Sequence, residues 1–137
     1  MPPLVLDTPP LAPEADQLCP GLLGGLPLQL DGAPARPVRS ASPYAVAWGE
    51  PPVVLRCGVP PPAALGPTSQ LIQINQVAWL AKQQSAGVLW TAVNRAVYVD
   101  VLVPPERNSD PVAVLSTVLA ERLPVLSAPS SAPTPTG

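Results

Sequence analysis

Two cysteines, Cys19 and Cys57, constrain the fold of this chain most, because a pair of cysteines in a short chain is what a single disulfide requires. Cys57 lies in the segment 53–59, where a period of two residues predicts a strand with one apolar face. The residues on that face are Val53, Leu55, Cys57 and Val59. Val54 and Arg56 fall on the opposite face. The Cys57 side chain is therefore predicted to point into the core.

Cys19 begins a helical pattern in which apolar side chains recur three, four and seven residues further along the chain. The members of this stripe are Cys19, Leu22, Leu23 and Leu26. Pro20 is suited to the first position of such a helix. A helix packed on the sheet face that carries Cys57 would bring both sulfur atoms into one layer, so we predict a disulfide between Cys19 and Cys57. Closing a loop of this length would stabilise the fold by about 3 to 4 kcal/mol.

Two cysteines in a short chain can also be free thiols, zinc ligands or a catalytic nucleophile. Two buried free thiols in a cytosolic protein are the alternative to the disulfide. A structural zinc site needs about four ligands, and the chain has two cysteines and no histidine. A thiol nucleophile needs a base or a positive field, but strand alternation turns Arg56 away from the Cys57 face. We therefore expect no metal and no cofactor.

The composition is that of one folded domain. The chain has 137 residues, of which 47% are apolar and 12% charged, so we expect a hydrophobic core despite the 23 prolines. The net charge is −2 and the seven basic residues are scattered singly, which argues against binding to nucleic acid. No apolar run reaches the roughly 18 residues that span a membrane.

Several segments have the residue pattern of strands and end at turn-forming residues or prolines. They are 44–48, 53–59, 70–75, 77–82, 88–93 and 96–103. The turn-forming residues 85–87 predict a hairpin between residues 77 and 93. The segment 31–43 is rich in Gly, Pro and Ser and is predicted to be a loop. The proline runs 51–52 and 60–62 are explained as the places where strands terminate. A partner that recognises polyproline helices would also bind such runs.

A second helix is predicted from Asp110 to the residues before Pro124. Asp110 is typical of an N-cap, and Pro111 follows it at the first helical position. Together with the helix at Cys19, this pattern predicts an α+β fold with an antiparallel sheet of about five strands, two helices on one face, and one disulfide.

The domain is predicted to occupy residues 14–124. Residues 1–13 form a proline-rich lead segment. Residues 125–137 are expected to be a flexible tail, because their mostly small and polar side chains bury too little surface to offset the entropy of ordering.

The sheet face without helices is a candidate interaction surface. Alternation places Arg56, Tyr98 and Asp100 on this face, and Trp79 or Trp90 joins them if their strands run in the matching register. Each residue also has a structural explanation. Arg56 and Asp100 would form a surface ion pair, and the tryptophans would fill the core of a domain that has no phenylalanine.

Three segments, 48–58 (WGEPPVVLRCG), 67–71 (PTSQL) and 95–99 (RAVYV), resemble an actinobacterial envelope-protein family of unknown function, the domain of unknown function 3515. The resemblance covers about residues 18–124. It implies an extracytoplasmic domain, secreted or membrane-anchored. The first residues lack the features of a signal peptide. Members of the family resemble envelope proteins with an N-terminal membrane helix or lipoprotein-type leader, so the resemblance implies that such an anchor has been removed ahead of Met1.

The expected function is that of a non-catalytic domain of the cell envelope, whose partner is an unknown envelope protein or cell-wall ligand. The alternative is a small carboxylate-dependent hydrolase acting on a cell-wall component. Its acid and base would be drawn from Glu50, Asp100, Glu106 or Asp110, but no spacing in the sequence fixes two of them at the separation that glycoside hydrolysis needs. We therefore expect no catalytic residue.

Overall fold

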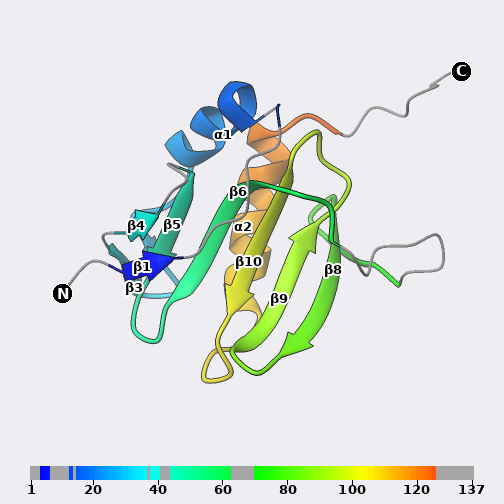
Figure 1. The fold of residues 1–137 in the computed structure, drawn as a ribbon. Helices are drawn as coiled ribbons and strands as arrows, with labels where there is room; N and C mark the ends of the chain where they lie inside the picture. Colours follow the sequence, from blue (N-terminus) through cyan, green and yellow to red (C-terminus); the bar gives the residue numbers. More distant parts are fainter. Residues whose placement is uncertain are drawn as a thin grey trace, which may run out of the picture.

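The computed structural model describes residues 4–6, 13, 15–36, 38–40, 44–62 and 70–125. This part of the chain contains ten strands and two helices (Figure 1). The helices are α1 (Ala15–Gly24) and α2 (Asp110–Arg122). The strands are β1 (Leu4–Leu6), β2 (Gln29–Leu30), β3 (Ala33–Arg36), β4 (Val38–Ser40), β5 (Ala45–Trp48), β6 (Val53–Val59), β7 (Ile72–Ile74), β8 (Val77–Gln84), β9 (Gly87–Ala92) and β10 (Tyr98–Val103).

Eight of these strands form one sheet in the order β2-β3-β5-β6-β10-β9-β8-β7, and each neighbouring pair is antiparallel. β1 and β4 form a separate parallel pair. The predicted α+β class, with an antiparallel sheet, two helices and one disulfide, is confirmed. The predicted number of about five strands is wrong, because the sheet has eight.

The strands of this sheet that no pattern predicted are β2 and β3, which are short and lie together at one end of it. β3 and β4 both lie in the segment 31–43, which was predicted to be a loop. Pro34 in β3 has no N–H for a ladder hydrogen bond, and a proline-rich segment therefore lacks the residue pattern that predicts a strand. The loop prediction is therefore wrong for these two strands. The central strands and the β8–β9 hairpin, which closes between Gln84 and Gly87, are where they were predicted.

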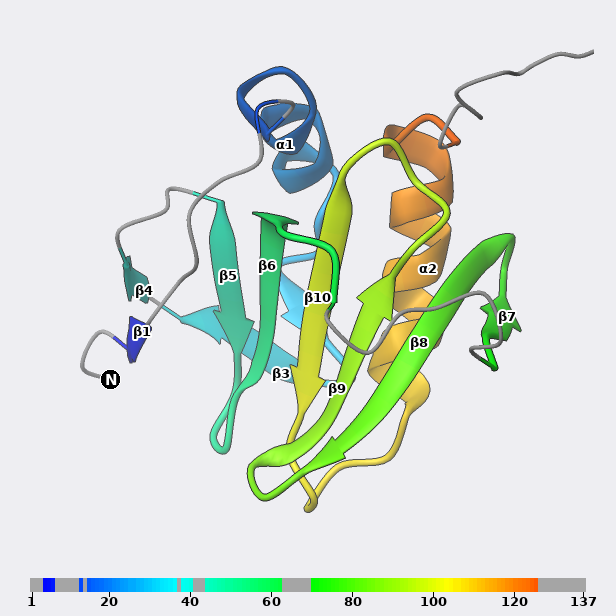
Figure 2. The ribbon, with the colours of Figure 1, turned by 45° about the vertical axis from the view of Figure 1, so that its right-hand side comes forward.

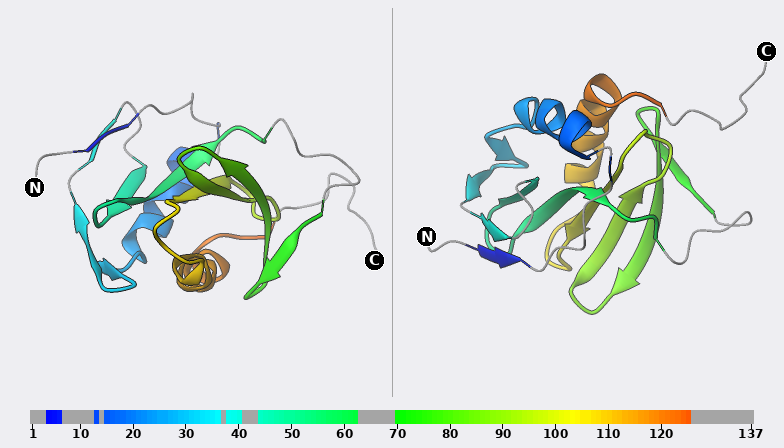
Figure 3. Two further views of the ribbon diagram at one scale, coloured as in Figure 1. Left: turned by 90° about the horizontal axis from the view of Figure 1, so that it is seen from below. Right: turned by 45° about the horizontal axis from the view of Figure 1, so that its top comes forward.

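Both helices pack on one face of the sheet, as predicted (Figures 2 and 3). A single row of residues crosses β6, β10, β9 and β8 on this face. The row consists of Cys57, Val99, Ala92 and Trp79. α1 joins it through the disulfide of Cys19, and α2 joins it where the indole of Trp79 donates a 2.7 Å hydrogen bond to the Ser116 hydroxyl. The hydrophobic core fills the space between this row and the helices.

α1 starts earlier than its apolar stripe suggests. It begins at Ala15, so Pro20 lies inside the helix and the prediction of Pro20 at the first helical position is wrong. Ala15 adds a buried residue one turn before Cys19, which explains why the helix extends in that direction. Cys19 and Leu22 are fully buried, as the stripe predicts.

α2 also differs from its prediction by one residue at its start. The N-cap is Ser109, so Asp110 is the first helical residue rather than the cap. The side-chain oxygen of Asn108 accepts a 2.9 Å hydrogen bond from the Asp110 N–H, which satisfies a donor that the helix itself leaves open.

A register shift at the end of β6 changes which face Val59 occupies. Cys57 pairs with Val99, but Val59 pairs with Tyr98, so one extra residue of β6 lies between the two pairs. That residue is Gly58, whose φ of 89° is a conformation that glycine adopts without strain. Val59 is buried outside the main core cluster, and the prediction that it shares a face with Cys57 is wrong.

No helix in the described part of the chain is long and apolar enough to span a membrane. Nearly all of the tail predicted at residues 125–137, and most of the lead segment predicted at residues 1–13, lie outside the described residues. Two contacts involve the first and the last described residues. β1 pairs with β4, and Val125 forms an isolated bridge with Arg95.

Candidate functional site

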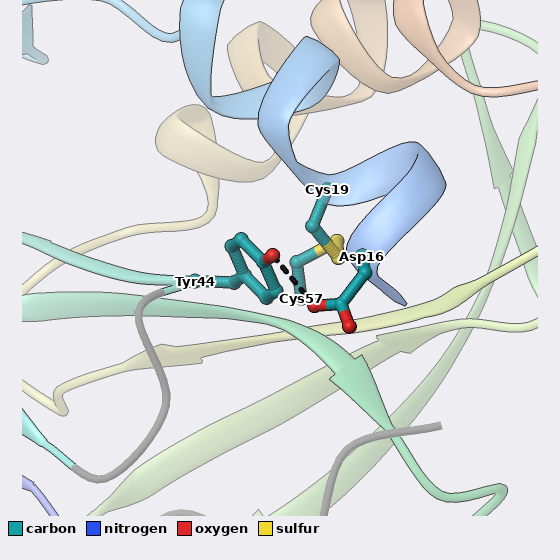
Figure 4. The surroundings of a disulfide bond; sticks show 4 residues. All are labelled: Asp16, Cys19, Tyr44 and Cys57. Carbon is teal, nitrogen blue, oxygen red and sulfur yellow. Dashed lines mark hydrogen bonds between the residues drawn. A yellow bond between two sulfur atoms is a disulfide. The ribbon is translucent and has the colours of Figure 1, made fainter. Parts of the chain in front are cut away.

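The disulfide between Cys19 and Cys57 is confirmed, and its two Cα atoms are 5.9 Å apart. Both cysteines are buried, with exposed fractions of 0% and 1%. The bond lies between α1 and β6, with Tyr44 and Asp16 beside it (Figure 4). The hydroxyl of Tyr44 donates a 2.8 Å hydrogen bond to the Asp16 carboxylate. That hydrogen bond raises the pKa of the Tyr44 phenol, because the carboxylate stabilises the protonated form.

The guanidinium of Arg56 and the carboxylate of Asp100 form a bidentate ion pair on the sheet face that carries no helix. Arg56 Nε donates to Asp100 Oδ1 at 2.9 Å, and Arg56 Nη2 donates to Oδ2 at 2.6 Å. The side chain of Asp100 is 6% exposed and that of Arg56 is 25% exposed. This pair is therefore largely buried, in contrast to the exposed surface pair that the sequence suggested.

The strand register separates the two tryptophans from this ion pair. Trp79 lies in the same row as Cys57, and Trp90 lies in the row of Leu55 on β6, so both tryptophans face the helices. Their rings meet edge to face with centroids 6.5 Å apart. Tyr98 is half-buried beside the bulge of β6. A role in binding for Arg56, Asp100 and Tyr98 stays a prediction.

The carboxylates proposed for a hydrolase have different surroundings. Glu50 pairs with Arg36 at the turn between β5 and β6, and Asp100 pairs with Arg56. Glu106 and Asp110 are exposed in the loop before α2 and at the first residue of that helix. Within the described residues, no three acidic, cysteine or histidine side chains gather in a group that could hold a metal ion.

A cleft of about 230 Å³ lies between the end of the β8–β9 hairpin and the loop that leads from β10 into α2. We call it the Trp90 cleft. Its lining residues are Gln83, Gly87, Val88, Trp90, Val103, Pro104, Pro105, Arg107, Asn108 and Ser109. Trp90 is half-buried there, whereas Trp48 and Trp79 are fully buried in the core. The lining thus combines an aromatic and aliphatic floor with a polar rim.

The close approach of the hairpin to β10 depends on Gly87, whose φ is 138°. A side chain at this position would collide with the backbone carbonyl of Val103, so only glycine brings the two walls of the cleft this close.

The rim of the cleft is rich in hydrogen-bond donors. Arg107 is the only charged residue in the lining. Its Nε donates to the carbonyl of Pro51 at 3.2 Å, and it forms no ion pair with a described residue. Asn108 uses its side-chain oxygen on the N–H of Asp110, and the Ser109 hydroxyl does not cap α2. The lining therefore offers donors and a positive charge, and none of its residues carries a carboxylate.

The sequence pointed to Trp90 but not to Arg107, Asn108 or Ser109. The three residues precede the predicted second helix, where an Asn-Ser-Asp sequence is explained by helix capping alone. Only the packing of the β8–β9 hairpin beside this loop indicates that the same residues line a cleft.

Comparison with known proteins identifies the family. Residues 2–127 match the family model described as "Protein of unknown function (DUF3515)". The chain belongs to the DUF3515 family. The match includes every strand of the DUF3515 sheet, both helices and the two cysteines. No curated protein and no solved structure matches this DUF3515 chain.

Proposed function

We propose that this domain acts in the cell envelope as a non-catalytic binding domain, secreted or membrane-anchored, and that it binds an envelope protein or cell-wall ligand through the Trp90 cleft. The observation that carries the proposal is the lining of the cleft, which contains both the one partly exposed tryptophan among the three and Arg107, an arginine that forms no ion pair with a described residue. Ligand sites are typically concave and mostly apolar, with a few polar groups that orient the ligand.

The disulfide supports an extracytoplasmic location. Disulfides persist in oxidising compartments and are rare in the reducing cytosol. Because Cys19 and Cys57 are both buried, their bond links α1 to β6 and has no exposed sulfur that would exchange with other thiols.

The proposal is tested by sedimentation of the oxidised full chain with a cell-envelope fraction from its source organism. Trp90→Leu removes the aromatic side chain from the lining of the cleft. Leu28→Ser is the matched control, because Leu28 is a large apolar residue that is 84% exposed away from the lining. Thermal unfolding of each variant establishes that it is folded before binding is measured.

We expect the wild type and Leu28→Ser to sediment with the envelope and Trp90→Leu to remain in solution. Equal sedimentation of all three proteins would exclude the cleft as the binding site. Release of soluble fragments from the envelope, lost in Asp100→Asn, would instead support the hydrolase and overturn the non-catalytic proposal.

A further inference from the structure

The chemistry of the Trp90 cleft narrows the class of its ligand. We infer that the cleft binds the C-terminal residue of a peptide, with the carboxylate at the Arg107 rim and an apolar side chain against Trp90. This inference rests on the proposed function, since it names the ligand of the same cleft.

The charge of the lining favours a carboxylate. Arg107 contributes the only formal charge, and no aspartate or glutamate is among the lining residues. The neighbouring side chains of Gln83, Asn108 and Ser109 add amide and hydroxyl donors. A carboxylate accepts up to about four hydrogen bonds, and an arginine beside neutral donors is a common arrangement for binding one.

The N-terminus of α2 does not account for the preference of the cleft for a carboxylate. The N–H of Asp110 is already bonded to Asn108, residue 111 is a proline, and the N–H of Val112 is bonded to the carbonyl of Ser109. Asp110 itself places a negative charge in the first turn. The attraction for an anion therefore comes from the Arg107 side chain and the donors of the rim.

The apolar part of the lining favours a single side chain of moderate size. The apolar lining residues are Trp90, Val88, Val103 and two prolines. The cleft volume of about 230 Å³ holds one aliphatic or aromatic side chain, since an apolar cavity of roughly 150 Å³ is enough for benzene.

A peptide end fits this lining better than a free amino acid. A free amino acid carries an ammonium group next to its carboxylate, and the cleft has no acidic residue to pair with it. In a peptide the same nitrogen is an uncharged amide. The inferred ligand is therefore N-acylated and carries one negative charge.

The test uses three small probes and the fluorescence of Trp90, the only tryptophan that is not fully buried. The probes are N-acetyl-L-leucine, its uncharged analogue N-acetyl-L-leucinamide, and free L-leucine. For a ligand of this size we expect a Kd on the order of 1 mM for the acid. The amide and the free amino acid should bind at least about tenfold more weakly.

Gln83 and Gln84 provide a matched pair of variants. Both glutamines are exposed on β8, but only Gln83 lines the cleft. Gln83→Glu should weaken binding of the acid several-fold and Gln83→Lys should strengthen it. The same changes at Gln84 should have much smaller effects, because the added charge lies outside the lining and is screened by solvent.

The inference is overturned if the amide binds as well as the acid, if none of the probes binds, or if the Gln84 variants change affinity as much as the Gln83 variants. These outcomes differ from failure of the proposed function. Loss of envelope binding in Trp90→Leu, without binding of the acid, would retain the cleft as the binding site and reject only the peptide carboxylate as its ligand.

Discussion

At the level of single residues, the Arg56–Asp100 pair joins two charged groups in a largely buried place. Burial raises the pKa of Asp100, while the hydrogen bonds and the charge of Arg56 act in the opposite direction. The hydrogen bonds to Asp100 raise the pKa of Arg56. The largely buried carboxylate of Asp100 thus depends on Arg56 to remain charged, whereas the guanidinium stays charged in any case.

Replacing Arg56 should therefore lower the free energy of unfolding more at neutral pH than at acidic pH. Arg56→Ala leaves the Asp100 carboxylate buried without its partner, and we expect a loss of about 2 to 3 kcal/mol in the free energy of unfolding at pH 7. Because burial then acts on Asp100 unopposed, its folded pKa lies above the unfolded value of about 3.9, and stability falls as pH rises from that value through the folded pKa.

Urea denaturation of Arg56→Ala between about pH 4 and pH 7 measures this effect. The deficit relative to the wild type should shrink as the pH falls, and the double variant Arg56→Ala/Asp100→Asn should not show this recovery. The same pH dependence in the single and double variants would mean that Asp100 is not its source.

At the level of secondary structure, a different kind of buried interaction joins each helix to the central strands of the sheet. α1 is linked covalently through Cys19 and Cys57. α2 is attached through Ser116, which is fully buried, donates to the carbonyl of Val112 at 2.7 Å and accepts a hydrogen bond from Trp79. The buried guanidinium of Arg95 adds bonds to the carbonyls of Leu123 and Gln76, so it ties the end of α2 to the β7–β8 turn.

Loss of the disulfide should lower stability substantially. The cysteines are 38 residues apart, and a loop of that length predicts a loss of about 4 kcal/mol for Cys19→Ala/Cys57→Ala. Denaturant unfolding of the variant and of the wild type, with and without reductant, measures this loss. In the folded wild type we expect neither cysteine to react with an alkylating reagent before reduction. Identical unfolding midpoints with and without reductant would contradict the prediction.

The attachment of α2 should show energetic coupling between Trp79 and Ser116. Ser116→Ala leaves the buried indole N–H without an acceptor, and we expect it to cost about 1 to 3 kcal/mol. In a double-mutant cycle, Ser116→Ala should lower the free energy of unfolding by about 1 kcal/mol less in the Trp79→Phe background than in the wild type. Strictly additive losses would mean that this hydrogen bond does not stabilise the helix on the sheet.

At the level of the whole molecule, two backbone contacts join the last described residues to the segment before β10. The N–H of Ala96 donates to the carbonyl of Pro124 at 2.9 Å, and Val125 forms a bridge with Arg95. The residues beyond them are mostly small or polar, with too few apolar side chains to form a core of their own.

Two truncations test where the domain ends. A chain that stops after Val125 should keep the thermal midpoint of the full chain within about 1 °C, because it retains both contacts. A chain that stops after Arg122 loses Leu123, Pro124 and the bridge at Val125, and its midpoint should fall by several degrees. Equal midpoints for the two truncations would contradict this boundary.

Local patterns in the chain were sufficient for the central elements. The alternation in β6 and β10, the buried stripe of α1 and the facing cysteines all follow from side chains a few residues apart, so the α+β class and the disulfide were predictable. Interactions between distant segments established the rest. Strand register put Trp79 and Trp90 on the helix side, and pairing stabilised the proline-containing β3 that has no clear pattern of its own. The Trp90 cleft exists because the β8–β9 hairpin lies beside the loop before α2, and no run of neighbouring residues encodes a contact between segments so far apart.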